Sequence, residues 1–268
     1  MALTIAGSDS SSGAGLQADL KTFAAHGVYG VNALAATVAE VPGEVARFET
    51  TAPTLLSLQL DRVASSFPLS AAKTGMLGSA ENVEVASRFA GQHPNVPLVV
   101  DPVVFATADA RLLSEDGLAA MKSSLIPRAL LVTPNRMEAE ALLGKSIQTA
   151  GDLAAAPHRL YDRYGTNFLV KGGHIADGDT VTDYLWLDRE TIGYSHPRLE
   201  ISDTHGTGCT LSAAIAACLA KGQPLAEAVG HAIDYLAKCL ESRFEWSVDG
   251  AGIAALNHFP DGVDFTRP

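Results

Sequence analysis

Residues 203–210 combine a helix start, two glycines and a thiol in the sequence Asp-Thr-His-Gly-Thr-Gly-Cys-Thr. Apolar residues then recur with the spacing of one helix face, at Leu211, Ala214, Ile215, Cys218 and Leu219. The first N–H groups of a helix lack intrahelical partners and carry the positive end of the helix dipole, and glycine lets a backbone approach a ligand closely. We therefore predict an anion hole for a phosphate, formed by Gly206, Thr207, Gly208 and Cys209.

Cys209 lies at the edge of this predicted anion hole. The positive potential of a helix start favours the thiolate form of a cysteine, so Cys209 is a candidate base for the proton of an alcohol substrate. If it stays protonated, it would instead orient that substrate. Taken alone, residues 203–210 also fit an ordinary turn that starts a buried helix, because short glycine motifs recur by chance.

Three oxygen-bearing side chains follow predicted strands. Asp101 follows the apolar segment 98–100, and Asn135 and Glu138 follow the segment 130–133. Because the carboxyl ends of parallel strands meet at one edge of a sheet, we expect these residues to lie close together. Carboxylates, waters and nucleotide phosphates suit Mg²⁺, so we predict a magnesium site. Asn135 and Glu138 also match the spacing of a helix capping box, which is the alternative interpretation.

A lysine beside two glycines follows the predicted strand 168–170. Lys171 is placed to reach a phosphate as a point charge, although on its own it fits an ordinary solvated lysine. His26, His174 and His205 show no metal-ligand spacing. We expect His205 to shape its loop rather than to act as an acid or a base.

Strands and helices alternate along the chain, which predicts an α/β fold with a mostly parallel sheet covered on both faces. The predicted strands are residues 3–6, 31–39, 71–74, 98–100, 130–133 and 168–170, and the predicted helices are residues 16–27, 55–67, 83–89 and 137–143 and two more starting at Gly206 and Pro224. Residues 181–187 and 191–194 alternate in polarity and predict a small antiparallel hairpin. No long linker or repeat interrupts the pattern, so we expect a single domain over residues 1–268.

Two other glycine motifs offer rival functions. Residues 13–18 resemble a dinucleotide fingerprint at a helix start, and Glu40 ends the next predicted strand, which together would suit an oxidoreductase. However, the polar loop 7–12 separates the first strand from these glycines, whereas a dinucleotide-binding turn is tighter. Residues 144–146, Gly-Lys-Ser, resemble the end of a P-loop, but Ala139 stands where the first glycine is required and the segment follows a helix.

The overall composition restricts the class of partner. The chain has 268 residues and a formal net charge of −11, which argues against nucleic acid as a partner. Its three cysteines lack the C-x-x-C spacing of zinc sites. The N-terminal residues show no leader peptide, and no apolar run reaches the length of a membrane span. We expect a cytoplasmic protein that does not associate with membranes and acts on a small-molecule substrate.

Several blocks of the chain, in the expected order, resemble the hydroxymethylpyrimidine/phosphomethylpyrimidine kinases of thiamine biosynthesis, within the ribokinase superfamily. The matching blocks are residues 4–9, 13–22, 27–30, 101–103, 133–135 with Glu138, 170–174 and 204–213. The resemblance implies a ribokinase-like three-layer α/β/α sandwich, a homodimer, and ATP with Mg²⁺. It also implies two successive phosphorylations, first of a hydroxymethyl group and then of the resulting monophosphate. It leaves a monovalent-cation requirement open.

The resemblance also implies a role for each matched residue. The pyrimidine pocket would use Ala14, Asp19, Val38, Glu40, Met76, Val103 and Cys209. The segment from Gly206 to Cys209 would hold the transferred phosphoryl group, and Lys171 would neutralise the phosphates. Asp101, Asn135 and Glu138 would organise the magnesium ion, largely through water.

This chain departs from the family pattern at three places. Glu40 replaces the usual glutamine, and a carboxylate only accepts hydrogen bonds whereas an amide also donates them, so we expect altered substrate choice or pH dependence. Ser12 replaces a glycine, and residues 105–109 lack the usual Lys-Ser-Gly flap, which makes the second phosphorylation less secure than the first. A pyridoxal-type vitamer kinase is the nearest alternative, and a non-catalytic pyrimidine-binding regulator is another.

Overall fold

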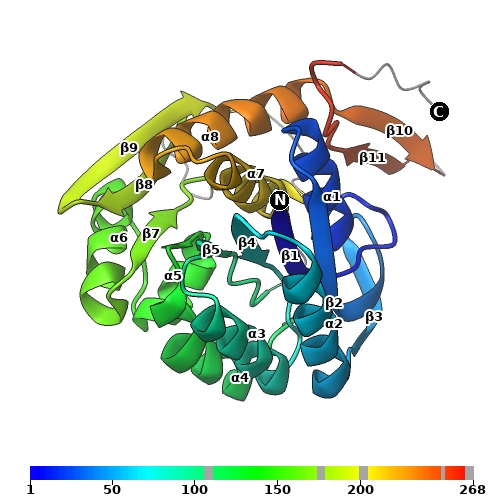
Figure 1. Cartoon of the computed structure of the whole chain (residues 1–268). Coiled ribbons are helices and arrows are strands. Elements are labelled where there is room, and N and C mark those ends of the chain that lie inside the picture. The colour runs from blue at the N-terminus through cyan, green and yellow to red at the C-terminus, as the bar shows by residue number, and fades with distance from the viewer. Residues whose placement is uncertain (106–110, 174–178, 199–204, 249–250, 263–268) are drawn as a thin grey trace.

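The computed structural model describes residues 1–105, 111–173, 179–198, 205–248 and 251–262. Its centre is a nine-stranded sheet with the strand order β3-β2-β1-β4-β5-β6-β7-β8-β9 (Figure 1). The strands are β1 (Ala2–Gly7), β2 (Gly30–Val41), β3 (Glu44–Thr50), β4 (Ala71–Thr74), β5 (Leu98–Val100), β6 (Leu131–Val132), β7 (Asn167–Val170), β8 (Thr180–Leu187) and β9 (Glu190–Pro197). The pairs from β2 to β7 are parallel, and β3, β8 and β9 join antiparallel at the two edges.

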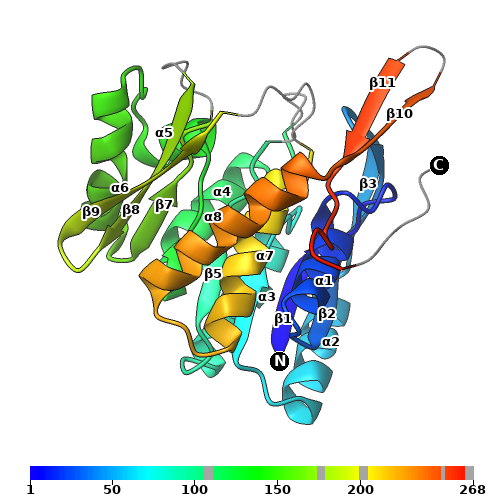
Figure 2. The same cartoon turned by 90° about the horizontal axis from the view of Figure 1, so that it is seen from above.

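Helices cover both faces of this sheet. One face carries α1 (Gly15–Ala25), α7 (Thr207–Ala220) and α8 (Leu225–Glu241), which lie side by side in Figures 1 and 2. The opposite face carries α2 (Pro53–Ser66), α3 (Ala80–Gln92), α4 (Glu115–Ala120), α5 (Arg136–Leu143) and α6 (Ala150–Tyr164). A π-turn (Met121–Leu125) and a 3-10 turn (Ile126–Arg128) follow α4. A separate hairpin, β10 (Phe244–Val248) with β11 (Ala251–Ala255), follows α8 (Figure 2).

The central strands supply apolar side chains to both helix layers. In β5, Leu98 and Val100 pack on the α2–α6 face, whereas Val99 packs with α7 and α8 on the other face. A strand buried on both faces needs a continuous apolar run rather than alternation, which is why such short runs identify the parallel strands. The same division holds in β7, where Phe168 and Leu169 belong to opposite layers.

The sequence prediction of a mostly parallel sheet covered by helices is confirmed, as is the antiparallel pairing of β8 with β9. The strands β3, β10 and β11 and the helices α4 and α6 were not predicted. The side chains of β3 are exposed or half-buried along its whole length, so no apolar alternation marks it. Within the described ranges, no helix has both the length and the apolar character needed to cross a membrane.

Candidate active site

A cavity of about 630 Å³ lies at the carboxyl ends of the parallel strands. Residues after β1, β4, β5, β6 and β7 line it, together with the start of α7 and one side of α8. Most of the residues that the sequence indicated lie in its wall, namely Ala14, Glu40, Met76, Asp101, Val103, Asn135, Glu138, Lys171, Gly206, Thr207, Gly208 and Cys209. The fold thus brings together side chains that are separated by up to about two hundred positions in the sequence.

The start of α7 packs tightly against the loop between β1 and α1. Gly206 has a φ of 82° at the N-cap, and a Cβ there would lie 1.9 Å from the carbonyl oxygen of Gly13. Only glycine fits that position. A Cβ at Gly208 would lie 3.2 Å from Nζ of Lys171 and 3.6 Å from Oδ2 of Asp101. The predicted anion hole therefore lies directly beside a lysine and a carboxylate.

Charged groups cluster beside the start of α7. Nζ of Lys171 lies 3.5 Å from Oδ1 of Asp101. Burial acts to lower the pKa of Lys171, but Asp101 and Glu138 outweigh it and raise that pKa above its usual value. Burial raises the pKa of Glu138 to about 7, with Lys171 opposing and Asp101 adding to the shift. Lys171 is thus a fixed cation rather than a solvated lysine.

Asn135 and Glu138 form a capping box at the start of α5. The side chain of Asn135 accepts a hydrogen bond from the Glu138 N–H at 2.9 Å, and Glu138 Oε2 accepts one from the Asn135 N–H at 2.8 Å. The second oxygen, Oε1, accepts a hydrogen bond from the Val104 N–H at 3.4 Å. The capping interpretation of this pair is therefore confirmed, and both residues also line the cavity.

The thiol of Cys209 lies between the starts of two helices. The backbone N–H of Gly15, the first residue of α1, acts on its sulfur to lower the pKa of the thiol. Burial nevertheless raises the pKa of the Cys209 thiol to about 12, with Lys73 opposing the shift and Asp101 adding to it. Desolvation thus opposes the helix field that we expected to favour the thiolate, and the role of Cys209 as base or orienter stays a prediction.

Two residues that the resemblance placed in the substrate pocket lie behind its wall. Asp19 on α1 is fully buried, and its oxygens lie 2.7 and 2.8 Å from Nζ of Lys73 on β4, which is also fully buried. Oγ1 of Thr4 donates a hydrogen bond to Asp19 at 2.5 Å. Val38 is buried and packs with Met76. Contact of Asp19 or Val38 with a substrate stays a prediction, whereas the Asp19–Lys73 pair is structural.

We expect Lys73→Met to lower the free energy of unfolding by about 3–5 kcal/mol, because it leaves the Asp19 carboxylate buried without its partner. Urea unfolding measures this loss. The double variant Lys73→Met with Asp19→Asn should unfold at higher urea than the single variant. The matched control is Lys238→Met, which breaks an exposed ion pair with Asp261 and should cost at most about 1 kcal/mol. Equal losses for the two single lysine variants would contradict this assignment.

Glu40 occupies the part of the cavity wall formed by the end of β2. Its backbone is held in place by Ser10, whose Oγ accepts a hydrogen bond from the Glu40 N–H at 2.9 Å and donates one to the Glu40 carbonyl at 2.7 Å. Burial raises the pKa of the Glu40 carboxyl to about 7, and the nearby Asp9 adds to the shift. Glu40 therefore changes its protonation state near neutral pH.

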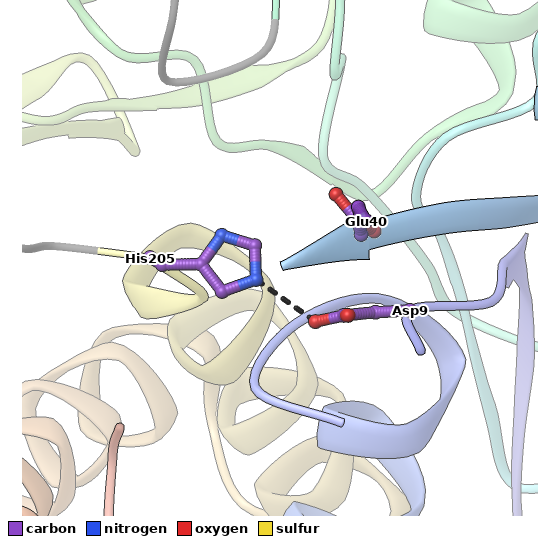
Figure 3. Close-up of side chains that lie close together, drawn as sticks. All are labelled: Asp9, Glu40 and His205. Atoms are coloured by element: carbon purple, nitrogen blue, oxygen red, sulfur yellow. Dashed lines mark hydrogen bonds and ion pairs between the residues drawn. The ribbon is translucent and has the colours of Figure 1, made fainter. Parts of the chain in front are cut away.

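Asp9 and His205 connect the β1–α1 loop to the start of α7 (Figure 3). His205 Nε2 lies 2.8 Å from Oδ2 of Asp9. Burial acts to raise the pKa of Asp9, but hydrogen bonds from His205, Ser11 and the Ala14 N–H outweigh it and hold that pKa well below its usual range. The expectation that His205 shapes its loop agrees with this contact. Asp9, Glu40 and His205 offer ligand atoms within 4.8 Å of one another, but both oxygens of Asp9 already accept hydrogen bonds.

Comparison with known proteins gives a consistent result. A family model described as phosphomethylpyrimidine kinase matches residues 9–254. The chain belongs to the phosphomethylpyrimidine kinase family. A hydroxymethylpyrimidine/phosphomethylpyrimidine kinase of Rhizobium meliloti is 42% identical over 267 residues, which cover 97% of each chain. The thiamine biosynthesis bifunctional protein ThiED of Geobacter sulfurreducens is 41% identical over 87% of this chain, which spans only 48% of the length of that protein.

Solved structures of related kinases share the fold. A phosphomethylpyrimidine kinase of Clostridium difficile has a TM-score of 0.79 and 33% identity, covering 89% of this kinase and 98% of that chain. A pyridoxal kinase of Staphylococcus aureus in complex with AMP-PCP and pyridoxal has a TM-score of 0.85 and 32% identity, covering 97% of this kinase and 93% of that chain. The ribokinase-like α/β/α sandwich is therefore confirmed. The oxidoreductase interpretation of residues 13–18 is wrong, because this chain belongs to a kinase family.

Sequence reasoning missed part of the cavity wall of this kinase. Ile233, Leu236 and Leu240 fit the apolar stripe of a core helix, yet these residues of α8 line the cavity. Their spacing is the same in both roles, so no sequence signal separates them. Asp183 on β8, which also lines the cavity and accepts a hydrogen bond from the Gly172 N–H at 2.7 Å, was missed as well. Some predicted residues lie outside the described part of the chain, namely His174, Asp203, Thr204 and positions 106–109 of the flap.

Proposed function

We propose that this kinase transfers the terminal phosphoryl group of ATP to the hydroxymethyl group of 4-amino-5-hydroxymethyl-2-methylpyrimidine, and then phosphorylates the monophosphate, in thiamine biosynthesis. The names of its relatives supply the substrate class. The observation that carries the proposal is the position of residues 206–209. They adjoin Lys171 and Asp101 on one side, and His205 before them adjoins Asp9 near Glu40. The phosphates would therefore lie on the side of Lys171 and Asp101, and the ring alcohol on the side of Glu40. The two would come together at the start of α7.

The residues present fit the demands of phosphoryl transfer, which are positioning and charge stabilisation. The N–H groups at the start of α7 would hold the oxygens of the transferred group as negative charge shifts among them. Lys171, kept charged by Asp101 and Glu138, would neutralise the phosphates. The Cys209 thiol would orient the alcohol. A monovalent cation and a direct role of Thr207 side-chain atoms are not needed for this account.

The oxygen donors at the cavity also fit Mg²⁺. Asp101, Asn135 and Glu138 all line it, and carboxylate and amide oxygens with waters are the ligands that this ion prefers. When bound, Mg²⁺ would neutralise negative charge on the ATP phosphates. Asp101 is the residue best placed to hold it directly. Asn135 and Glu138 would act through water, because their oxygens already serve the capping box.

ATP is the expected phosphoryl donor, because a neighbouring kinase structure contains the ATP analogue AMP-PCP. The apolar side chains of Ile233, Leu236 and Leu240 would cover the base. We further propose that residues 1–268 act as one kinase domain and that this domain works in the cytoplasm with ATP as its phosphoryl donor. We also propose a homodimer, which would use an exposed surface such as the free edge of the sheet at β3. Light scattering measures the mass in solution and so tests the dimer.

A pyridoxal-type vitamer kinase is the second candidate, because the Staphylococcus aureus structure is a pyridoxal kinase complex with pyridoxal. A substrate panel decides between the two. ADP formation is measured with hydroxymethylpyrimidine, its monophosphate and pyridoxal at equal concentrations. We expect the highest kcat/KM with hydroxymethylpyrimidine, and ADP formation with the monophosphate as well. A higher kcat/KM with pyridoxal would replace the proposal, and no ADP with any of the three would refute kinase activity on this substrate class.

A further inference from the structure

The loop between β1 and α1 meets the start of α7 at three points. His205 Nε2 lies 2.8 Å from Oδ2 of Asp9. A Cβ at Gly206 would lie 1.9 Å from the Gly13 carbonyl oxygen, so the two backbones are in contact. The ring of His205 also packs against Gly13, where a Cβ would lie 3.0 Å from Cδ2. These three contacts link two segments that are 196 residues apart at Asp9 and His205.

Several hydrogen bonds hold Asp9 in the loop between β1 and α1. Its side chain is fully buried, and Oδ1 accepts a hydrogen bond from the Ser11 N–H at 2.6 Å. Oδ2 accepts one from the Ala14 N–H at 2.7 Å, next to Gly15. The Asp9 N–H in turn donates to Oε1 of Gln17 on α1 at 2.8 Å. The carboxylate therefore fixes the path of the chain up to Gly15, the first residue of α1.

His205 is the last residue before the anion-hole segment 206–209. Its side chain is only 11% exposed, and its ring also packs against Gly13, where a Cβ would lie 3.0 Å from Cδ2. A bond from its ring to Asp9 fixes His205 relative to α1. Because the N–H groups of Gly206 to Cys209 follow at once, their direction depends on where His205 is held.

We propose that the Asp9–His205 hydrogen bond is a clamp that sets the position of the α7 start relative to α1, and so positions both the anion-hole N–H groups and the Cys209 sulfur for phosphoryl transfer. The two side chains are positioning residues, because they act through the backbone of residues 206–209. The expected effect of the clamp on turnover rests on the proposed kinase activity. Its expected effect on the position of Cys209 does not depend on that activity.

The clamp makes a prediction about turnover. His205→Gln and Asp9→Asn should each lower kcat for hydroxymethylpyrimidine by up to about 100-fold, because small displacements of positioned groups cost that much. The KM for ATP should change far less than kcat. In the double variant the losses should not multiply, because both changes weaken the same contact. The control is His158→Gln, which breaks a histidine–aspartate pair with Asp162 away from the cavity.

A second readout needs no catalysis. Iodoacetamide labelling followed by mass spectrometry gives the alkylation rate of Cys209, while the buried Cys218 and Cys239 serve as internal references. Loss of the clamp should let the start of α7 move relative to α1 and increase the alkylation rate of Cys209 several-fold, with His158→Gln unchanged. Thermal unfolding excludes global unfolding as the cause, and His205→Gln serves if Asp9→Asn fails to fold.

The outcomes separate the clamp from the proposed function. Wild-type alkylation rates and wild-type kcat in both folded variants would overturn the clamp. Equal losses in kcat for His158→Gln would also overturn it. If the wild-type protein forms no ADP with the substrate panel, the proposed function fails, while the alkylation rates still support or refute the clamp.

Discussion

Cys209→Ala is expected to lower kcat by about 100-fold or more, with the Kd for ATP changed by less than about threefold. The sulfur lies at the lip of the predicted anion hole in the cavity wall, so its loss disturbs the place where alcohol and phosphoryl group are proposed to meet. Steady-state ADP formation and nucleotide titration measure the two quantities. The control is Cys218→Ala, which lies on the same helix but is buried in the core.

Cys209→Ser distinguishes an orienting thiol from a base. Burial raises the pKa of Cys209 to about 12, which favours the protonated thiol and hence the orienting role. We therefore expect the serine hydroxyl to retain much more turnover than alanine does, because a hydroxyl also orients an alcohol by hydrogen bonding. Equal loss in both variants would favour a thiolate base formed only when the substrates bind. Unchanged turnover in Cys209→Ala would remove Cys209 from the mechanism.

Glu40→Gln is expected to remove a pH dependence of substrate binding. A carboxylate only accepts hydrogen bonds, so Glu40 pairs with an aminopyrimidine edge either when Glu40 is protonated or when the ring nitrogen is. In both cases the complex holds one proton between them. Because burial raises the pKa of Glu40 to about 7, that proton is already present below pH 7 and must be taken up above it.

The KM of the wild-type kinase for hydroxymethylpyrimidine should therefore rise by up to about tenfold per pH unit above pH 7, and the KM of Glu40→Gln should stay flat. Steady-state kinetics from pH 6 to 9 measure both curves. Glu49→Gln, an exposed change on the neighbouring strand β3, should follow the wild-type curve. Parallel profiles and unchanged substrate preference in Glu40→Gln would show that Glu40 does not read the ring.

The sequence predicts the central parallel strands of this fold better than the strands at the edges of the sheet. Segments such as Leu98–Val100 are predicted because a strand between two helix layers must be apolar on both sides. The helix α6 was missed, because Pro157 and Gly151 lie inside it and both weaken helical patterns. The edge strand β3 was missed because exposed strands carry no apolar alternation.

The candidate site was also predicted only in part, because a sequence shows residue types but not the surroundings of each side chain. Residue types and their positions after strands were enough to gather Asp101, Glu138 and Lys171 at one cavity. Burial was not visible in the sequence. It places Asp19 in a buried pair with Lys73 and raises the pKa of the Cys209 thiol, because desolvation depends on neighbours that are distant along the chain.

The most direct test of the account is a crystal structure of the kinase with AMP-PCP, Mg²⁺ and hydroxymethylpyrimidine. The measured quantity is the distance from the terminal phosphate oxygens to the backbone nitrogens of residues 206–209. We predict hydrogen bonds of about 3 Å to these nitrogens, with the hydroxymethyl oxygen facing the same phosphorus atom. A terminal phosphate bound elsewhere, for example on the loop 8–14 and out of reach of the start of α7, would contradict the account.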